Sequence, residues 1–504
     1  MSYNENQFVG ISGFDEISGL VIEVRLSCCC LFGQEIDESR PTSPLTIEQT
    51  GRDAQLLISV LRGIHPGYMR YRTAADVTAA EQAFLAAATD ARNTGEMYLT
   101  VSKFLAAIRC EHTEAELPPQ MLEWRNKHAS MLPVAFAWIG GKAIVTGVAP
   151  EVTGILAGDE SIEVDGRPMQ DLYEATIPYI SVDGFTDYTK ASIFSGSDDI
   201  GLTTFDVFYP LMHGFSSSFG LSVRGTDGHL RQTRVSAVGT EVSNAVRGIG
   251  RAQSNFSDKA AVSWSRVGNT AVLNINTFVN YRTPIDPESV FGPVFREIGD
   301  SGVDRLVLDF RSVGGGSDDV MNSLLRHLID KPITVGGPSR VKTYQFDAFR
   351  RYLSTWDENV FNMPASLFVE DDTGMYTVSP EVTGGTRQVE PAPDAWKGSL
   401  TVLIGPNNES GATVLLAELR DERTATLVGE LTGGSAEGPT GGVIAFLSLP
   451  ESTIRVRVPL LWTTTSYKAF TPGKGIEPDI VVEKTIEDIR TGRDRVLEVA
   501  TKRE

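Results

Sequence analysis

Two stretches in the second half of the chain show the same order of apolar and polar positions. Residues 306–308 and 400–404 are short apolar runs, each of a length that suits a buried strand. Each run leads into a loop of small and polar residues, and apolar residues at helical spacing follow at 320–328 and 414–419. Both stretches therefore predict a strand, a loop and a helix in that order.

The first half of the chain divides into a helical part and a strand-rich part. Apolar residues recur at helical spacing over 46–117, and Pro66 breaks the pattern between the first two helices. Residues 121–238 contain strand-like runs, with a tight Asp-Gly hairpin predicted at Asp165. Residues 173–218 interrupt these runs and are interpreted as an insertion.

Ser410 stands at the strand-to-helix turn of the later stretch, between the turn 405–408 and Gly411. A hydroxyl in this place lies at a helix N-terminus, where free backbone N–H groups can stabilise a developing oxyanion. Gly411 leaves the backbone open to a substrate oxygen because it has no side chain. The pattern fits a catalytic nucleophile; it also fits a helix N-cap, since serine is common there.

The loop of the earlier stretch contains three consecutive glycines, Gly314, Gly315 and Gly316. Glycines let backbone N–H groups approach a ligand closely. No Gly-Lys-Ser/Thr follows, so this is not a Walker loop, and the spacing differs from the GxGxxG of dinucleotide sites. By itself the loop does not identify a ligand, so we interpret it together with the later stretch that contains Ser410.

Together the two stretches resemble the tail-specific (C-terminal-processing) and tricorn-type serine peptidase family. The chain reads LDFRSVGGG where the family carries LDLRxNxGG, and SGAT where it carries its SAxE-like nucleophile turn. VGELTGGS at 428–435 and GIEPDIVVE at 475–483 are further family-like pieces in the family's order. Val313 replaces the usual Asn and Thr413 the usual Glu or Ser, so the match departs from the family at two positions.

The resemblance implies an α/β fold in which a crotonase-like spiral catalytic domain follows a helical cap and a β-rich PDZ-like domain. We assign 1–44 to a leader, 45–120 to the helical cap, 121–250 to the PDZ-like peptide-binding domain with its insertion, and 251–504 to the catalytic domain. The segment GDESIEVDGRPM is similar to a PDZ turn, and such modules bind a peptide by adding it to a sheet edge. The alternative is a β-rich spacer.

The resemblance also implies roles for individual residues. Ser410 is the nucleophile, and the backbone N–H groups of Gly411 and of Gly314 or Gly315 hold the oxyanion. The base is His112, which falls on the histidine of the CGHT segment in one family branch, with Glu111 in place of its Gly. A histidine at a helix end can instead be a favourable C-terminal cation.

The family's other base is a lysine, and Ser435 stands where that lysine would be. Lys468 and Lys474 lie further on in a loop, so a histidine base is predicted, with a pH limb near the imidazole pKa of roughly 6 to 7. Glu430 and Glu437 are candidates for an acid that orients the base, although most glutamates are solvated or structural. His65 is assigned a structural role.

Composition is that of a globular enzyme, with 41% hydrophobic and 22% charged residues among 504. The net charge of −20 disfavours nucleic acid or an anionic membrane as a partner, because both would repel the chain. Three of the four cysteines are adjacent and no HExxH occurs, so neither a disulfide framework nor a metallopeptidase is indicated. No metal or organic cofactor is implied.

The N-terminal residues 19–33 are the candidate targeting segment. Glu23 and Arg25 interrupt the apolar run, which makes it too short and too charged to span a bilayer. The segment reads either as a leader with a faint lipoprotein-like cleavage site before Cys28 or as a loosely packed extension. An extracytoplasmic location is implied by the family resemblance alone.

The predicted function is a serine peptidase that hydrolyses peptide bonds of proteins or peptides. One alternative is a catalytically inactive relative that binds peptides or apolar ligands, because a fold does not fix a function. Another is a crotonase-like acyl enzyme, which would need a phosphate-cradling basic loop that the sequence does not show.

Overall fold

The computed structural model describes residues 40–196, 202–247, 255–383, 385–421 and 425–502. The leader predicted at 1–44 lies outside these ranges except for its last five residues. Helices and sheets of both parallel and antiparallel type are present, so the expected mixed α/β content is confirmed.

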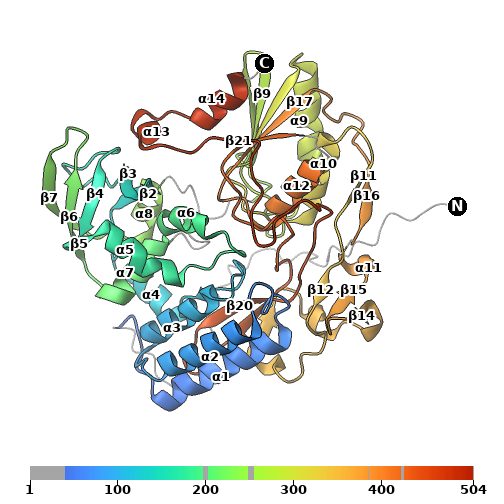
Figure 1. The fold of residues 1–504 in the computed structure, drawn as a ribbon. Coiled ribbons are helices and arrows are strands. Elements are labelled where there is room, and N and C mark those ends of the chain that lie inside the picture. Colours follow the sequence, from blue (N-terminus) through green and yellow to red (C-terminus); the bar gives the residue numbers. More distant parts are fainter. Residues whose placement is uncertain (1–39, 197–201, 248–254, 384, 422–424, 503–504) are drawn as a thin grey trace, which may run out of the picture. The chain divides into compact units, whose positions relative to one another are not determined.

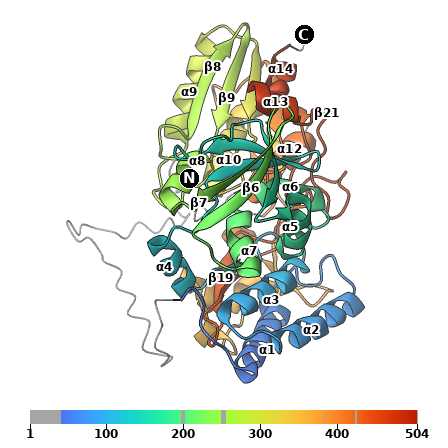
Figure 2. The same cartoon turned by 90° about the vertical axis from the view of Figure 1, so that its left-hand side faces the viewer.

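Three helices open the described chain and lie side by side: α1 (Ile47–Ile64), α2 (Ala74–Ala88) and α3 (Thr94–Ala106) (Figures 1 and 2). Thr46 and Thr73 close the starts of α1 and α2 with capping boxes, which satisfy amides that a helix start leaves unpaired. The apolar faces of all three helices meet in one core. The helical pattern expected here is confirmed.

An antiparallel sheet follows, with strand order β2-β3-β4-β6-β7 and β5 paired to β4. Its strands are β2 (Val134–Ile139), β3 (Lys142–Val148), β4 (Glu160–Val164), β5 (Arg167–Pro168), β6 (Ser218–Arg224) and β7 (Leu230–Ser236). The predicted Asp-Gly hairpin joins β4 to β5, and positive φ angles of 51° at Asp165 and 74° at Gly166 let the turn close. The predicted insertion forms helices: α5 (Met169–Thr176), α6 (Lys190–Ser195) and α7 (Thr204–His213).

The last part of the chain builds a mostly parallel sheet in the order β21-β18-β17-β10-β9-β8. Its strands are β8 (Val262–Val267), β9 (Thr270–Ile275), β10 (Arg305–Asp309), β17 (Ser399–Ile404), β18 (Thr426–Gly429) and β21 (Ile480–Val481). One face packs on α9 (Glu288–Asp300), α10 (Asp318–Leu328) and α12 (Ser410–Asp421), and the other on α14 (Arg495–Lys502). Side chains alternate between the faces, as Leu308 and Val307 do.

Both predicted strand, loop and helix stretches are confirmed, as β10 with α10 and β17 with α12. The two strands are parallel neighbours, with Leu308 opposite Val402. Because parallel neighbours end at the same edge of a sheet, the glycine loop after β10 and the turn before Ser410 meet there. Pairing of these strands therefore positions the two candidate stretches side by side.

A further sheet, with the strand order β1-β20-β19-β13, joins the helical part to the last part. Its strands are β1 (Ala115–Glu116), β13 (Leu353–Thr355), β19 (Ile444–Ser448) and β20 (Arg455–Pro459). Glu116 also contacts the guanidinium of Arg457 at 3.0 Å. Because β1 comes three residues after His112, its pairing fixes that histidine's segment against the last part of the chain.

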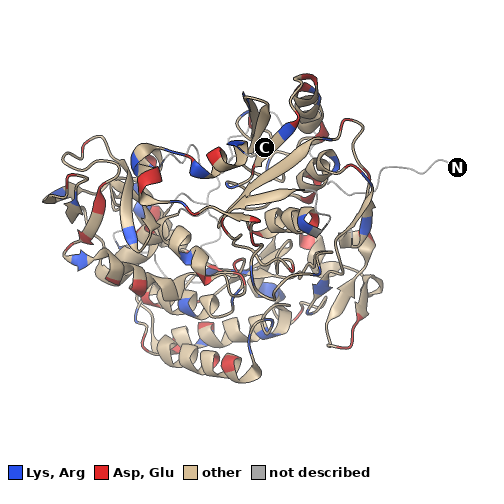
Figure 3. Ribbon diagram, turned by 45° about the horizontal axis from the view of Figure 1, so that its top comes forward, with Lys and Arg blue, Asp and Glu red and all other residues tan. Residues whose placement is uncertain are grey.

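The remaining described elements are short. They are α4 (Pro119–Lys127), α8 (Thr240–Val246), β11 (Ile333–Val335), β12 (Arg340–Val341), β14 (Phe368–Glu370), β15 (Tyr376–Val378), α11 (Pro380–Thr383), β16 (Arg387–Val389), α13 (Ile486–Thr491) and the 3₁₀ turns η1 (Ile177–Tyr179), η2 (Asp187–Thr189), η3 (Arg350–Tyr352), η4 (Glu358–Asn362) and η5 (Ala365–Leu367). Acidic and basic residues are interspersed over the whole described ribbon (Figure 3). None of the described helices has the length and apolar character needed to cross a membrane.

Asp53 of α1 is buried against the turn between β19 and β20, and it generates a stability prediction. Its carboxylate accepts the amides of Glu451 at 3.1 Å and Ser452 at 2.8 Å, and the Ser452 hydroxyl at 2.6 Å. Asp53→Ala leaves these donors without an acceptor, so we expect the free energy of unfolding to fall by about 1–3 kcal/mol. Chemical denaturation measures this change.

Arg52→Ala is the matched control, because Arg52 forms only an exposed ion pair with Glu451 at 2.8 Å. We expect little change in that variant. Equal losses in both variants would show that the buried network does not join the two parts.

Candidate active site

Ser410 is the first residue of α12, and its φ of +47° lies in the left-handed region. A non-glycine residue is strained there by roughly 1–2 kcal/mol, and such strain clusters at functional sites. An N-cap serine has an extended backbone and a hydroxyl that accepts from the first turn. The backbone of Ser410 differs from that, and it has the sharp strand-to-helix geometry that exposes nucleophilic serines in hydrolases.

The buried side chain of Asn408 holds the turn before Ser410 against the glycine loop. Its Oδ1 accepts the amide of Gly405 at 2.9 Å, and its Nδ2 donates to the carbonyls of Phe310 at 2.7 Å and Val313 at 3.0 Å. The sequence analysis treated residues 405–408 as a turn and missed this role. A turn asparagine has no local pattern that tells a buried position from an exposed one.

His112 lies beyond the end of α3, 298 residues before Ser410, and its Nε2 is 3.1 Å from the Ser410 hydroxyl oxygen. The imidazole lies flat against the backbone of Gly441, where a methyl group would come within 2.9 Å of the ring. The structure therefore brings together the two side chains that the sequence analysis paired. With a proton on Nδ1, Nε2 can accept the hydroxyl proton, as a general base must.

Glu111 is the acid beside His112. Its Oε1 is 3.4 Å from His112 Nδ1 and accepts the amide of Ser410 at 3.3 Å. In the sequence, Glu111 is a departure from the family pattern, and it is not among the acids predicted to orient the base. Adjacency to the histidine was the available clue, but neighbouring residues in a chain usually point apart, so the turn geometry decides the contact.

The two acids that the sequence analysis did consider have other partners. Glu437 accepts the Tyr71 hydroxyl at 2.6 Å, the Gly473 amide at 3.1 Å and the Arg70 guanidinium at 3.2 Å. Glu430 follows β18, and burial raises its pKa. Glu437 thus has a structural role, which is the alternative that the sequence offered to a role in orienting the base.

The glycine loop lies directly against the serine. A methyl group at Gly315, whose φ is +125°, would be 2.8 Å from the Ser410 Cβ and 3.1 Å from the Gly411 amide nitrogen. One at Gly411 would be 3.5 Å from the carbonyl of Gly316, and one at Gly314 would be 3.6 Å from the carbonyl of Asn407. The Gly411 amide lies in the first turn of α12, where amides lack partners within the helix. Backbone donors of both loops can therefore converge near the hydroxyl.

Three acidic groups lie near this pair, with Asp183 buried and Glu111 and Glu409 half-buried. Burial, with Glu409 and Asp183 nearby, raises the pKa of Glu111 well above its ordinary value. Burial and neighbouring acids raise the pKa of Glu409 to about 8, and burial raises that of Asp183 to about 6. Burial and then Arg457 lower the pKa of His112 to about 4, which is below the range expected from the sequence. The resting site thus favours a neutral imidazole, the form that accepts a proton.

His65 and Ser435 occupy supporting positions. His65 is buried, its Nε2 lies 2.7 Å from the Thr113 hydroxyl, and its Nδ1 accepts the Gly67 amide at 3.0 Å. These contacts fit the structural role assigned to it. Ser435, at the position of the family's lysine, donates its amide to Asp183 at 3.1 Å and its hydroxyl to Glu437 at 3.3 Å.

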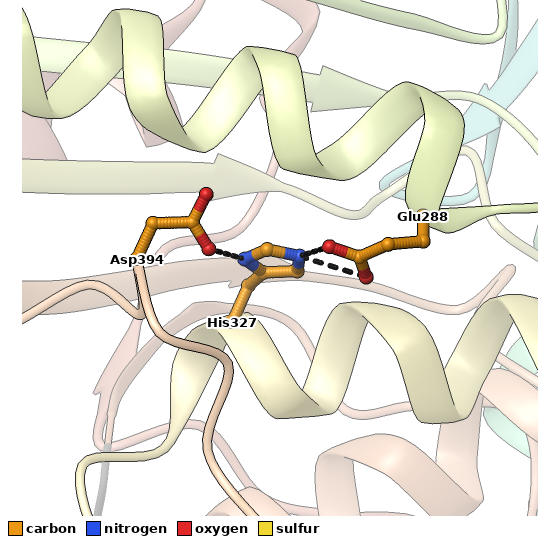
Figure 4. Close-up of side chains that lie close together, drawn as sticks. All are labelled: Glu288, His327 and Asp394. Atoms are coloured by element: carbon orange, nitrogen blue, oxygen red, sulfur yellow. Dashed lines mark hydrogen bonds and ion pairs between the residues drawn. The ribbon is translucent and has the colours of Figure 1, made fainter.

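A separate cluster of Glu288, His327 and Asp394 lies away from this pair (Figure 4). His327 Nε2 is 3.1 Å from Glu288, and Nδ1 is 3.3 Å from Asp394. The carboxylates face different ring nitrogens, so an ion at either nitrogen would gain one carboxylate ligand, fewer than a structural or catalytic zinc has. The ring thus bridges two acids, and we assign the cluster no metal.

A serine hydroxyl against a histidine nitrogen, with backbone donors beside it, defines the class of serine-type hydrolases that includes the peptidases. Residues 269–482 match the model of peptidase family S41. The match covers this part of the chain and confirms its resemblance to tail-specific serine peptidases.

Solved structures support the same fold. Mature CPAF has a TM-score of 0.60 at 17% identity, over 90% of this chain and 96% of that one. A CPAF complex with lactacystin has the same values with 97% of that chain covered. The photosystem II D1 C-terminal processing protease matches 86% of this chain and 93% of its own at 15% identity, with a TM-score of 0.41. Among curated proteins none matches this chain.

The contact of the glycine loop with Ser410 predicts opposite outcomes at neighbouring glycines. Gly315→Ala places a methyl group against the serine, so we expect kcat/KM for a peptide to fall about 100-fold or more, as it does when an oxyanion donor is lost. Gly314→Ala meets only an ordinary contact and should retain most activity. Gly315→Ala is also strained at a φ of +125°, so its melting temperature should fall, whereas that of Gly314→Ala should change little. A loss of kcat/KM in Gly315→Ala that matches the loss of folded protein would indicate a purely structural turn.

The burial of His112 predicts the pH dependence. A base works when neutral, so kcat/KM should rise with pH through the folded-state pKa, near 4 rather than 6 to 7. Unfolded His112 binds a proton near pH 6.5, so the free energy of unfolding should decrease as pH falls from there towards 4. A pH series of kcat/KM measures the first effect. A limb near pH 6 to 7 that persists in every His112 variant would contradict the assignment of His112 as the base.

Proposed function

We propose that this chain hydrolyses peptide bonds of proteins or peptides with Ser410 as nucleophile and His112 as general base. The observation that carries the proposal is the 3.1 Å contact between side chains 298 residues apart, one of them on a strained turn. Two such groups meet by chance rarely, and the strain of Ser410 has no evident structural use.

Each neighbouring group has a role in the proposed reaction. The Ser410 oxygen attacks the scissile carbonyl while its proton moves to His112 Nε2, which later gives that proton to the leaving amine. The amides of Gly411 and of Gly314 or Gly315 receive the developing oxyanion, a contribution of roughly 3 kcal/mol per donor. Water then hydrolyses the acyl-enzyme through the same base.

Glu111 acts in this proposal as the residue that orients His112. Its pKa is raised in the resting site, but an imidazolium beside it favours the ionised carboxylate. In its ionised form Glu111 stabilises the imidazolium that forms when the base takes the serine proton.

The finer architecture supports peptide substrates. We propose residues 251–504 as a crotonase-like spiral catalytic domain and 45–120 as a helical cap that delivers His112. Residues 121–250 are proposed as a PDZ-like domain; its antiparallel sheet has edges to which an extended peptide could add as a strand. Nucleic acid stays disfavoured by the net charge of −20.

A serine-directed fluorophosphonate tests the proposal on the purified chain. We expect labelling and peptide hydrolysis, and loss of both in Ser410→Ala. His112→Ala should lower kcat by several orders of magnitude, and Glu111→Gln by a smaller factor with a shifted pH profile. Lys468→Ala and Lys474→Ala are the controls and should be nearly silent. An unlabelled, folded wild-type chain would favour the inactive relative, and an inactive lysine variant would favour a lysine base.

A further inference from the structure

Two large aromatic side chains lie together on the surface. Tyr281 is 59% exposed and Trp356 is 69% exposed, and their rings stack with centroids 6.2 Å apart. Trp356 also packs edge-on against Phe446 of β19, with centroids 5.2 Å apart. We call Tyr281, Trp356 and Phe446 the aromatic platform.

Tyr281 connects the aromatic platform to the glycine loop. Phe278 forms a bridge with Gly316, and its carbonyl accepts the Ser317 amide at 2.9 Å. Gly316 directly follows Gly315, which lies against Ser410. Tyr281 comes three residues after Phe278, so their Cα atoms are at most ~11 Å apart. The platform thus reaches one side of the catalytic pair.

Trp356 connects the platform to the histidine side. It directly follows β13, where Thr355 pairs with Ala445 and donates its hydroxyl to the carbonyl of Ile444 at 2.8 Å. Ile444 is three residues from Gly441, on which the His112 ring lies, again at most ~11 Å. The two arms meet at the stacked rings, so short stretches of chain connect the platform to the neighbours of both Ser410 and His112.

The exposed rings of the aromatic platform favour an apolar occupant. Guanidinium groups lie over its rings, Arg282 at 5.7 Å from the Tyr281 centroid and Arg455 at 4.5 Å from that of Phe446. Arg455 is already paired with Glu116. Stacked, solvent-exposed rings of this size usually mark a binding surface, and Trp and Tyr supply much of the binding energy where they occur.

We infer that the aromatic platform binds an apolar side chain of the peptide substrate, on one side of the scissile bond. The inference rests on the proposed function, because continuity with Ser410 and His112 identifies the occupant as substrate. An extended peptide advances ~3.3 Å per residue, so a stretch of up to ~11 Å along either arm corresponds to roughly three residues of substrate. The platform therefore contributes to the choice of cleavage site.

Matched pairs of internally quenched peptides test this inference. Each pair differs by leucine or phenylalanine against glycine at one position within five residues of the cleaved bond. Wild-type enzyme should prefer the apolar peptide at one such position by about ten-fold in KM, a usual preference of an apolar pocket. Trp356→Ala and Tyr281→Ala should remove that preference with kcat and the melting temperature nearly unchanged, and Trp356→Phe should restore most of it.

Val369→Ala is the matched control, because Val369 on β14 is also 69% exposed and belongs to no part of the platform. It should leave the preference unchanged. If Trp356→Ala and Tyr281→Ala behave as this control does, the inference is overturned. If Trp356→Ala instead converts a dimer to a monomer in sedimentation without changing the preference, the surface binds a second copy and the inference is again wrong.

A binding measurement separates this inference from the proposed function. In the Ser410→Ala background, the apolar peptide should change the tryptophan fluorescence, and Trp356→Phe should abolish that change. If the wild-type chain neither cleaves peptides nor reacts with the fluorophosphonate but the fluorescence change persists, only the proposed function is disproved. Absence of that change in a chain that does cleave peptides disproves the platform alone.

Discussion

The spacing between two loops is the constraint on which the candidate site depends, and buried Asn408 sets it. Its side-chain amide donates to the carbonyls of Phe310 and Val313 in the loop after β10, while its side-chain oxygen accepts the Gly405 amide in the turn after β17. Removing a hydrogen-bond partner from a buried amide costs about 1–3 kcal/mol, so separating the two loops is energetically unfavourable. The strained φ of Ser410 and the close approach of Gly315 both follow from this fixed spacing.

His112 reaches this edge from a distant part of the chain, and backbone pairing fixes the position of its segment. The β1 strand, just after His112, adds to β20, and Asp53 fastens the helical part to the turn before β20. A histidine placed by tertiary contacts depends on the packing between parts. This couples the integrity of the helical part to the geometry of the serine, even though the two are remote in sequence.

Excess acid around the site has a functional consequence. Asp183 is buried and Glu111 and Glu409 are half-buried near the serine, and each has a raised pKa because loss of solvent and neighbouring acids disfavour the charged forms. Such coupled groups titrate as a set rather than singly. The same burial keeps His112 neutral, so the site is prepared to accept a proton before substrate arrives.

Local pattern by itself determined the strands, loops and helices at both candidate stretches, the first helices, the Asp-Gly hairpin and the serine and glycines worth testing. These follow from periodicity and turn chemistry, which act over a few residues. Only the tertiary structure decided that Glu111 rather than Glu430 or Glu437 lies beside His112, that Asn408 joins the loops, and that Tyr281 and Trp356 stack on each other at the surface. Such contacts join residues distant in the chain or depend on which way a side chain points out of a turn. Burial also moved the pKa of His112, since it is a property of the whole packed environment.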